Sequence, residues 1–125
     1  MLRAPTSPYR IGSPYWTKGS GLLEVPIQVT RGPRLPFIGT TLTLAGPRMA
    51  RYMAKLVVGS PLVNLELHGI DVLDADDGFT ELRDHQPDSR VPHARKLEAL
   101  DAVVAELRNA GYSFVRLDEA AEIYA

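Results

Sequence analysis

Segments with the apolar pattern of strands alternate along this chain with segments that have the pattern of helices. Apolar residues at every second position predict strands, and apolar residues three and four apart predict helices. The predicted strands cover residues 22–29, 62–68 and 112–115, residues 37–44 are β-prone, and the predicted helices cover 46–59, 92–111 and 118–124. Strictly alternating elements of this kind predict an α/β domain, with a mostly parallel sheet and crossover helices.

The two longer predicted helices each carry one apolar face that we expect to be buried. Proline in the first turn and glycine after the last turn predict where both helices begin and end. The expected buried residues are Met49, Met53, Leu56 and Val57 in the first helix, and Ala94, Leu97, Leu100, Val104 and Leu107 in the second.

Length and composition exclude several classes of protein. The 125 residues suit one domain and are too few for a complete (β/α)₈ barrel, which needs about 250. The formal net charge of -1 argues against nucleic acid as a partner. There is no cysteine, no signal-peptide pattern and no apolar run of about 18 residues that could span a membrane. We therefore expect a cytoplasmic protein.

The predicted strand at residues 62–68 has one polar face. Its alternation places Asn64, Glu66 and His68 on one side and three aliphatic residues on the other. His68 ends this strand, and in α/β folds catalytic groups gather at that end of the sheet. The alternative interpretation is an edge strand with one solvated face.

A stiff segment at the N-terminus carries a second group of polar residues. Arg3 and Tyr9 flank two prolines, and this arrangement could hold a guanidinium and a phenol over a site. Arginine is suited to binding a carboxylate with two hydrogen bonds. Alternatively, the segment is a terminal arm without a role. Beyond it, Tyr15 and Trp16 form an aromatic pair on a predicted loop.

Together these segments resemble the NodB-homology family of polysaccharide deacetylases. Arg3-Ala4-Pro5 with Tyr9 is similar to the family's Arg-x-Pro motif, in which the tyrosine usually stands closer to the proline. Leu65-Glu66-Leu67-His68 matches the Leu-x-Leu-His motif at its three fixed positions. Trp16 resembles the aromatic residue of the acetyl pocket. The likeness covers residues 1–125 as the C-terminal portion of a distorted NodB-like (β/α) barrel.

The resemblance implies part of a metal-dependent hydrolase that removes N- or O-acyl groups from sugars. It implies that His68 is the general acid for the leaving amine or alkoxide, a task that suits histidine near neutral pH. Arg3 would orient the catalytic carboxylate, and a divalent, zinc-like metal would polarise the acyl carbonyl. The residues expected to contact the carbohydrate are Tyr9, Trp16, Glu66 and Leu67.

The family's metal ligands and catalytic base precede its Arg-x-Pro motif, so the resemblance assigns no metal ligand to this chain. His85 and His93, eight residues apart near a predicted loop, are expected at the surface. The acidic run from Asp71 to Asp77 lacks calcium-loop spacing and is typical of a solvated loop, with contact to a polar substrate as the alternative. We expect a partial domain that is inactive alone and associates with a second copy or an N-terminal half-domain.

Two other classes of function stay open from the sequence. The chain could be a non-catalytic binding or assembly module that keeps half of the fold and has no chemistry of its own. It could also be an unrelated small α/β domain in which both motifs arise by chance. Replacement of His68 in a complete protein would separate the enzyme from the other two classes.

Overall fold

The computed structural model describes residues 4–124, so Arg3 lies outside the described residues. The fold is mixed α/β, and this part of the chain contains four α-helices and a two-stranded antiparallel sheet. The strands are β1 (Tyr9–Ile11) and β2 (Lys18–Glu24), and the helices are α1 (Gly39–Ala45), α2 (Pro47–Val57), α3 (His93–Asn109) and α4 (Leu117–Tyr124). Short 3₁₀ turns join α2 to α3: η1 (Gly69–Asp71), η2 (Ala75–Asp77), η3 (Thr80–Asp84) and η4 (Pro87–Arg90).

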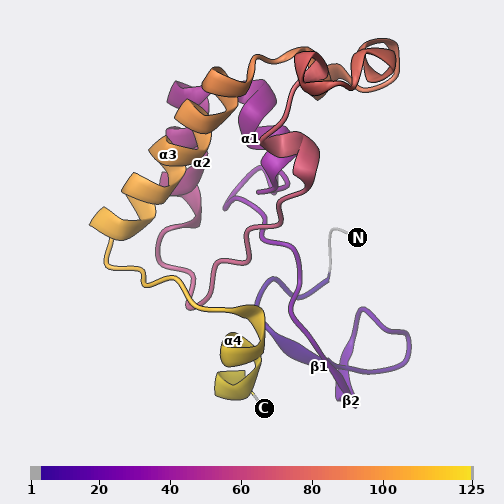
Figure 1. Ribbon diagram of the computed structural model, residues 1–125. Helices are drawn as coiled ribbons and strands as arrows, with labels where there is room; N and C mark the ends of the chain where they lie inside the picture. The colour runs from indigo at the N-terminus through magenta and orange to yellow at the C-terminus, as the bar shows by residue number, and fades with distance from the viewer. Residues whose placement is uncertain (1–3, 125) are drawn as a thin grey trace.

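Helices α1, α2 and α3 lie side by side at one end of the molecule, and the hairpin and α4 lie at the other (Figure 1). The core lies between these three helices. Alanines on the facing surfaces of α2 and α3 are fully buried, and their small side chains let the helices approach closely. The core residues are Phe37, Leu42, Ala50, Met53, Ala54, Val57, Ala99, Val103 and Leu107.

The predicted boundaries of α2, α3 and α4 are confirmed to within a few residues, but the predicted buried faces are only partly correct. Met49 is half exposed while Ala50 is buried, and Leu97 is exposed while Ala99 is buried. Both helices have apolar residues on more than one side, and packing between the helices buries the side with Ala50 and Ala54 in α2 and with Ala99 in α3. Ala94, which was expected to be buried, is exposed. The periodicity of apolar residues cannot predict which side is buried, because alanine counts as only weakly apolar.

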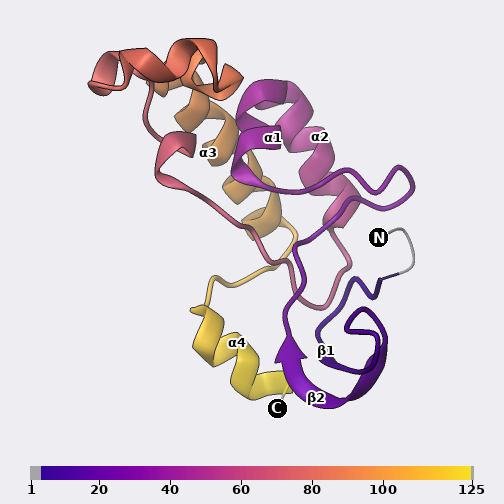
Figure 2. The ribbon, with the colours of Figure 1, turned by 90° about the vertical axis from the view of Figure 1, so that its right-hand side faces the viewer.

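The hairpin replaces the predicted strand at residues 22–29. Strand β2 ends at Glu24, which lies opposite Tyr9 in an antiparallel pair with β1. Pro26 follows and has no backbone N–H to continue the ladder. Figure 2 shows the hairpin and α4 below the helical layer.

The predicted parallel sheet is wrong for residues 4–124, whose one sheet is antiparallel. Residues 62–68 form no regular strand there. Glu66 makes one isolated parallel bridge, with Ile38. Three prolines between residues 26 and 36 remove N–H donors that neighbouring strands would need.

Two further predicted β segments also differ from the structure. Residues 37–44 were expected to be β-prone, but α1 begins at Gly39 within them. Leu42 and Thr43 of α1 are buried, so tertiary packing overrides the low helix propensity of the threonines in this segment. Residues 112–115 form no strand either. None of the helices described is long and apolar enough to cross a membrane.

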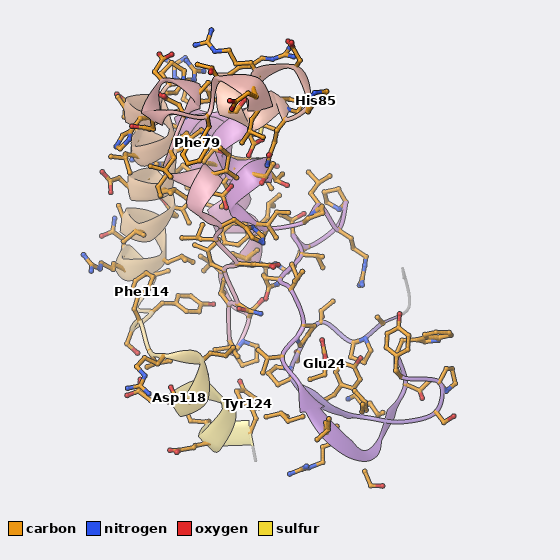
Figure 3. The ribbon with its side chains drawn as sticks, turned by 45° about the vertical axis from the view of Figure 1, so that its right-hand side comes forward. Glu24, Phe79, His85, Phe114, Asp118 and Tyr124 are labelled. Carbon is orange, nitrogen blue, oxygen red and sulfur yellow. The ribbon has the colours of Figure 1, made fainter. Side chains whose placement is uncertain are left out.

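An apolar groove of about 890 Å³ separates the end of α3 from α4 and residues 58–67. Phe114 lies between α3 and α4 (Figure 3), with the Arg108 guanidinium 5.5 Å from the centre of its ring. Several large apolar side chains of the groove are about half exposed or more, namely Leu67, Phe114, Val115, Leu117 and Ile123.

Candidate functional site

The segment that ends in His68 runs beside the start of α1. The Gly39 backbone N–H donates a hydrogen bond to the Glu66 carbonyl oxygen at 2.9 Å. This bond and the parallel bridge to Ile38 fix the register of the two segments. His68 then leads directly into the η1 turn, so its position is determined by α1 on one side and by η1 on the other.

The imidazole of His68 lies between two carboxylates. Its Nε2 is 3.5 Å from Oε1 of Glu66, and its Nδ1 is 3.8 Å from Oδ2 of Asp71. The two carboxylates differ in environment, because the Glu66 side chain is 39% exposed and that of Asp71 is 0% exposed. The His68 side chain is itself 61% exposed, so a molecule in solution can reach it. Such a ring can accept and donate a proton, which is the requirement for general acid–base catalysis.

Asp71 is buried and fully engaged with its neighbours. Its Oδ2 accepts the His68 backbone N–H at 2.7 Å, and its Oδ1 accepts the Thr40 hydroxyl at 3.1 Å. The Asp71 N–H donates in return to the His68 carbonyl oxygen at 3.0 Å. The carboxylate lies against Gly39, where a Cβ atom would come within 2.1 Å of Oδ2. Gly39 therefore leaves the space that the carboxylate occupies.

A buried lysine holds the turn that follows. Lys96 of α3 is fully buried, and its ammonium donates to the carbonyl oxygens of Ile70 and Leu73, at 2.5 Å each. These two bonds join the turn after His68 to the central helix of the core. Because a buried ammonium needs acceptors, Lys96 and the turn are expected to keep one arrangement.

Asp74 joins the same turn to the beginning of α3. Its carboxylate accepts the backbone N–H of His93 at 2.7 Å and that of Asp76 at 2.8 Å. These two backbone N–H groups, that of His93 foremost, lower the pKa of Asp74 below its ordinary value. The His93 N–H lies in the first turn of α3 and has no acceptor within the helix, so Asp74 supplies its hydrogen-bond acceptor.

Of the residues predicted for the site, Glu66 and His68 are together, and the aromatic ones are elsewhere. Tyr9 and Trp16 belong to the hairpin, at the other end of the molecule from η1 (Figure 1). Tyr9 is buried, and its hydroxyl donates to the Tyr15 carbonyl oxygen at 3.1 Å. Burial, with smaller contributions from Glu24 and Tyr15, raises the pKa of Tyr9.

The other candidate residues are also placed by the structure. Trp16 is about half exposed and meets Tyr15 edge to face, with ring centres 5.0 Å apart. Leu67 is half exposed and lines the apolar groove rather than the His68 side. His85 and His93 are exposed, as predicted, and Figure 3 shows His85 among the 3₁₀ turns, far from Glu24 of the hairpin.

Asp71 was not among the residues predicted for the site. Its acidic run was expected to form a solvated loop, but Asp71 is buried and the rest of the run forms the capped turn η2. The signal that could have found it is local: Asp71 stands among the apolar residues Ile70, Val72 and Leu73, whereas Asp74 to Asp77 are mostly acidic. A carboxylate in apolar surroundings, three residues after a candidate histidine, indicates a buried partner.

The described residues do not fit a metal site. Across residues 4–124, no three histidine, aspartate or glutamate side chains gather where they could hold a metal ion. His68, Glu66 and Asp71 lie close in sequence, but their oxygen and nitrogen atoms do not converge on one point. No step at this site is therefore assigned to a metal held by these residues.

Comparisons with known proteins returned no match: neither a family model, nor a curated protein, nor a solved structure is similar to this chain.

Proposed function

We propose that this chain is the proton-donating part of a carbohydrate deacetylase that removes an N- or O-acyl group from a sugar. The observation that carries the proposal is the environment of His68. This residue ends a Leu-x-Leu-His motif, is accessible to solvent, and lies between a buried and a half-exposed carboxylate. An imidazole that solvent can reach is the side chain best suited to transfer a proton near neutral pH.

His68 acts after water has added to the acyl carbon, when the tetrahedral adduct collapses to the carboxylic acid and the bond between the acyl carbon and the sugar nitrogen or oxygen breaks. The leaving atom keeps the electron pair of that bond and receives the proton from Nε2 of the imidazolium. The amine or alcohol is then released as a neutral group. General acid catalysis of this kind contributes about 10²–10⁴-fold to a rate. Glu66, 3.5 Å from the same nitrogen, is placed to contact the polar substrate.

The proposal includes a finer fold, the C-terminal portion of a NodB-like barrel. The parallel bridge between Ile38 and Glu66 supports it, because α1 and α2 connect the two residues as crossover helices connect barrel strands. The exposed apolar groove beside α4 supports the association with a second, metal-binding half. The divalent metal and the base of the reaction belong to that half in this proposal.

Acetate release tests the function. The purified chain with zinc, the chain mixed with the N-terminal half of a NodB-homology deacetylase, and each mixture with His68→Ala or His85→Ala are given N-acetylglucosamine oligomers. The proposal expects acetate from the wild-type mixture and from the His85→Ala control, and at least about 100-fold less from His68→Ala. Acetate from the chain alone, or equal rates for both variants, would contradict it.

A further inference from the structure

We infer that Asp71 is the positioning residue of His68: it fixes the backbone at His68 and selects the ring nitrogen that exchanges protons. This inference rests on the proposed role of His68 and names a residue that the motif does not include. The residues that build the arrangement are Gly39, Thr40, His68 and Asp71.

The first part of the role is control of the backbone. Oδ2 of Asp71 accepts the His68 N–H at 2.7 Å, and the Asp71 N–H donates to the His68 carbonyl oxygen at 3.0 Å. The two residues therefore close a ring of hydrogen bonds around the η1 turn. Thr40 holds the second carboxylate oxygen at 3.1 Å, so the carboxylate cannot rotate without losing a bond. A charge-assisted hydrogen bond of this kind is about twice as strong as a neutral one.

The second part is the choice of ring nitrogen. Nδ1 of His68 lies 3.8 Å from the buried Asp71, whereas Nε2 lies 3.5 Å from the more exposed Glu66. Neither distance is that of a hydrogen bond, so both carboxylates act on the ring through their charge, and solvent screens the charge of the exposed Glu66 more strongly than that of the buried Asp71. Asp71 thus favours a proton on Nδ1. Nε2 is then the nitrogen that takes up a proton from solvent and passes it to the leaving group.

Gly39 makes this arrangement possible. A Cβ atom at this position would come within 2.1 Å of Oδ2 and 2.3 Å of Cγ of Asp71. Only a residue without a side chain allows the carboxylate to lie against the start of α1. Gly69, next to His68, has open space around its Cβ position and is the matched control for substitutions of Gly39.

Nuclear magnetic resonance of the full, isotope-labelled chain tests the inference. Hydrogen exchange of the His68 amide reports the backbone bond, and the ring ¹⁵N shifts at pH 8 report the tautomer of the neutral imidazole. We expect Asp71→Ala to speed amide exchange about tenfold and to move the ring toward the Nε2–H tautomer. We expect Asp71→Asn, which keeps an acceptor oxygen, to retain most amide protection but to show the same tautomer change.

The control is Asp76→Asn, which removes an exposed carboxylate of the same acidic run and should change neither signal. A wild-type tautomer ratio in Asp71→Asn would overturn the inference, even if Asp71→Ala did not fold. An equal change in Asp76→Asn would also overturn it. Neither signal depends on deacetylation, so a failure of acetate release would refute the proposed function and leave the positioning role intact.

Discussion

Replacement of Gly39 by alanine is expected to destabilise the protein by displacing a carboxylate on another segment. The new Cβ would lie 2.1 Å from Oδ2, 2.3 Å from Cγ and 2.8 Å from Cβ of Asp71, all closer than such contacts occur. Asp71 must therefore move, and it loses one of its two bonds, to the His68 N–H at 2.7 Å or to the Thr40 hydroxyl at 3.1 Å.

The magnitude follows from three contributions. A hydrogen bond to a charged group is worth about 1.5–3 kcal/mol, and overpacking costs about 1–3 kcal/mol. Alanine offsets this by at most about 1 kcal/mol, because it favours helix over glycine. The clash outweighs the propensity, and we expect Gly39→Ala to lower the free energy of unfolding by about 2–4 kcal/mol. At roughly 4 °C per kcal/mol, Tm falls by roughly 8–16 °C.

The assay is urea unfolding of Gly39→Ala, with Gly69→Ala as the control that should stay within about 0.5 kcal/mol of wild type. The double variant Gly39→Ala with Asp71→Ala removes the carboxylate that the new methyl group would displace and leaves only the Cβ contact, so its loss should be smaller than the sum of the single losses by about 1–2 kcal/mol. Equal stability of the two glycine variants, or strict additivity of the double variant, would refute the reasoning.

Three further substitutions test how the surrounding structure is held together. Lys96→Met leaves the partly buried carbonyl oxygens of Ile70 and Leu73 without this donor and should cost about 2–4 kcal/mol in urea unfolding, so an unchanged midpoint would count against the bridge. The pKa of Asp74 is lowered in the folded state, so its stabilising effect is present above the ordinary aspartate pKa and is lost as pH falls through the folded value. Asp74→Asn should therefore lower Tm near pH 7 and approach wild type in strong acid, whereas a difference independent of pH would contradict this. Tyr112→Phe removes a hydroxyl that bridges the turn after α2 and should cost about 1–2 kcal/mol, whereas Tyr52→Phe, at an exposed position, should be neutral.

Helices α2 and α3 could be predicted from sequence because their boundaries are set locally, whereas α1 was not predicted. Pro47 begins α2, while Gly59 and Gly111 follow α2 and α3 with φ of 96° and 89°, where other residues are strained. The strands could not be predicted, because a strand needs a partner that is distant in sequence. Residues 62–68 have the alternating sequence pattern of a strand, yet among the described residues only Glu66 of this segment forms a β-bridge.

Contacts of the candidate site between residues close in sequence could be predicted, whereas contacts that depend on the packing of distant segments could not. Alternation placed Glu66 and His68 on one side, and their side chains do meet. Burial of Asp71 depends on α1, which leaves room for it at Gly39, and no local charge pattern encodes that contact. The position of Trp16 on the hairpin depends equally on how distant segments pack.

The dependence of the rate on the leaving group tests the central claim, that His68 protonates it. In the reconstituted mixture, an N-acetylated sugar needs a proton on its leaving amine, whereas 4-nitrophenyl acetate releases a stable anion without one. We expect His68→Ala to slow the sugar reaction by about 10²–10⁴-fold and the ester reaction by less than about tenfold. Equal losses for both substrates would contradict it.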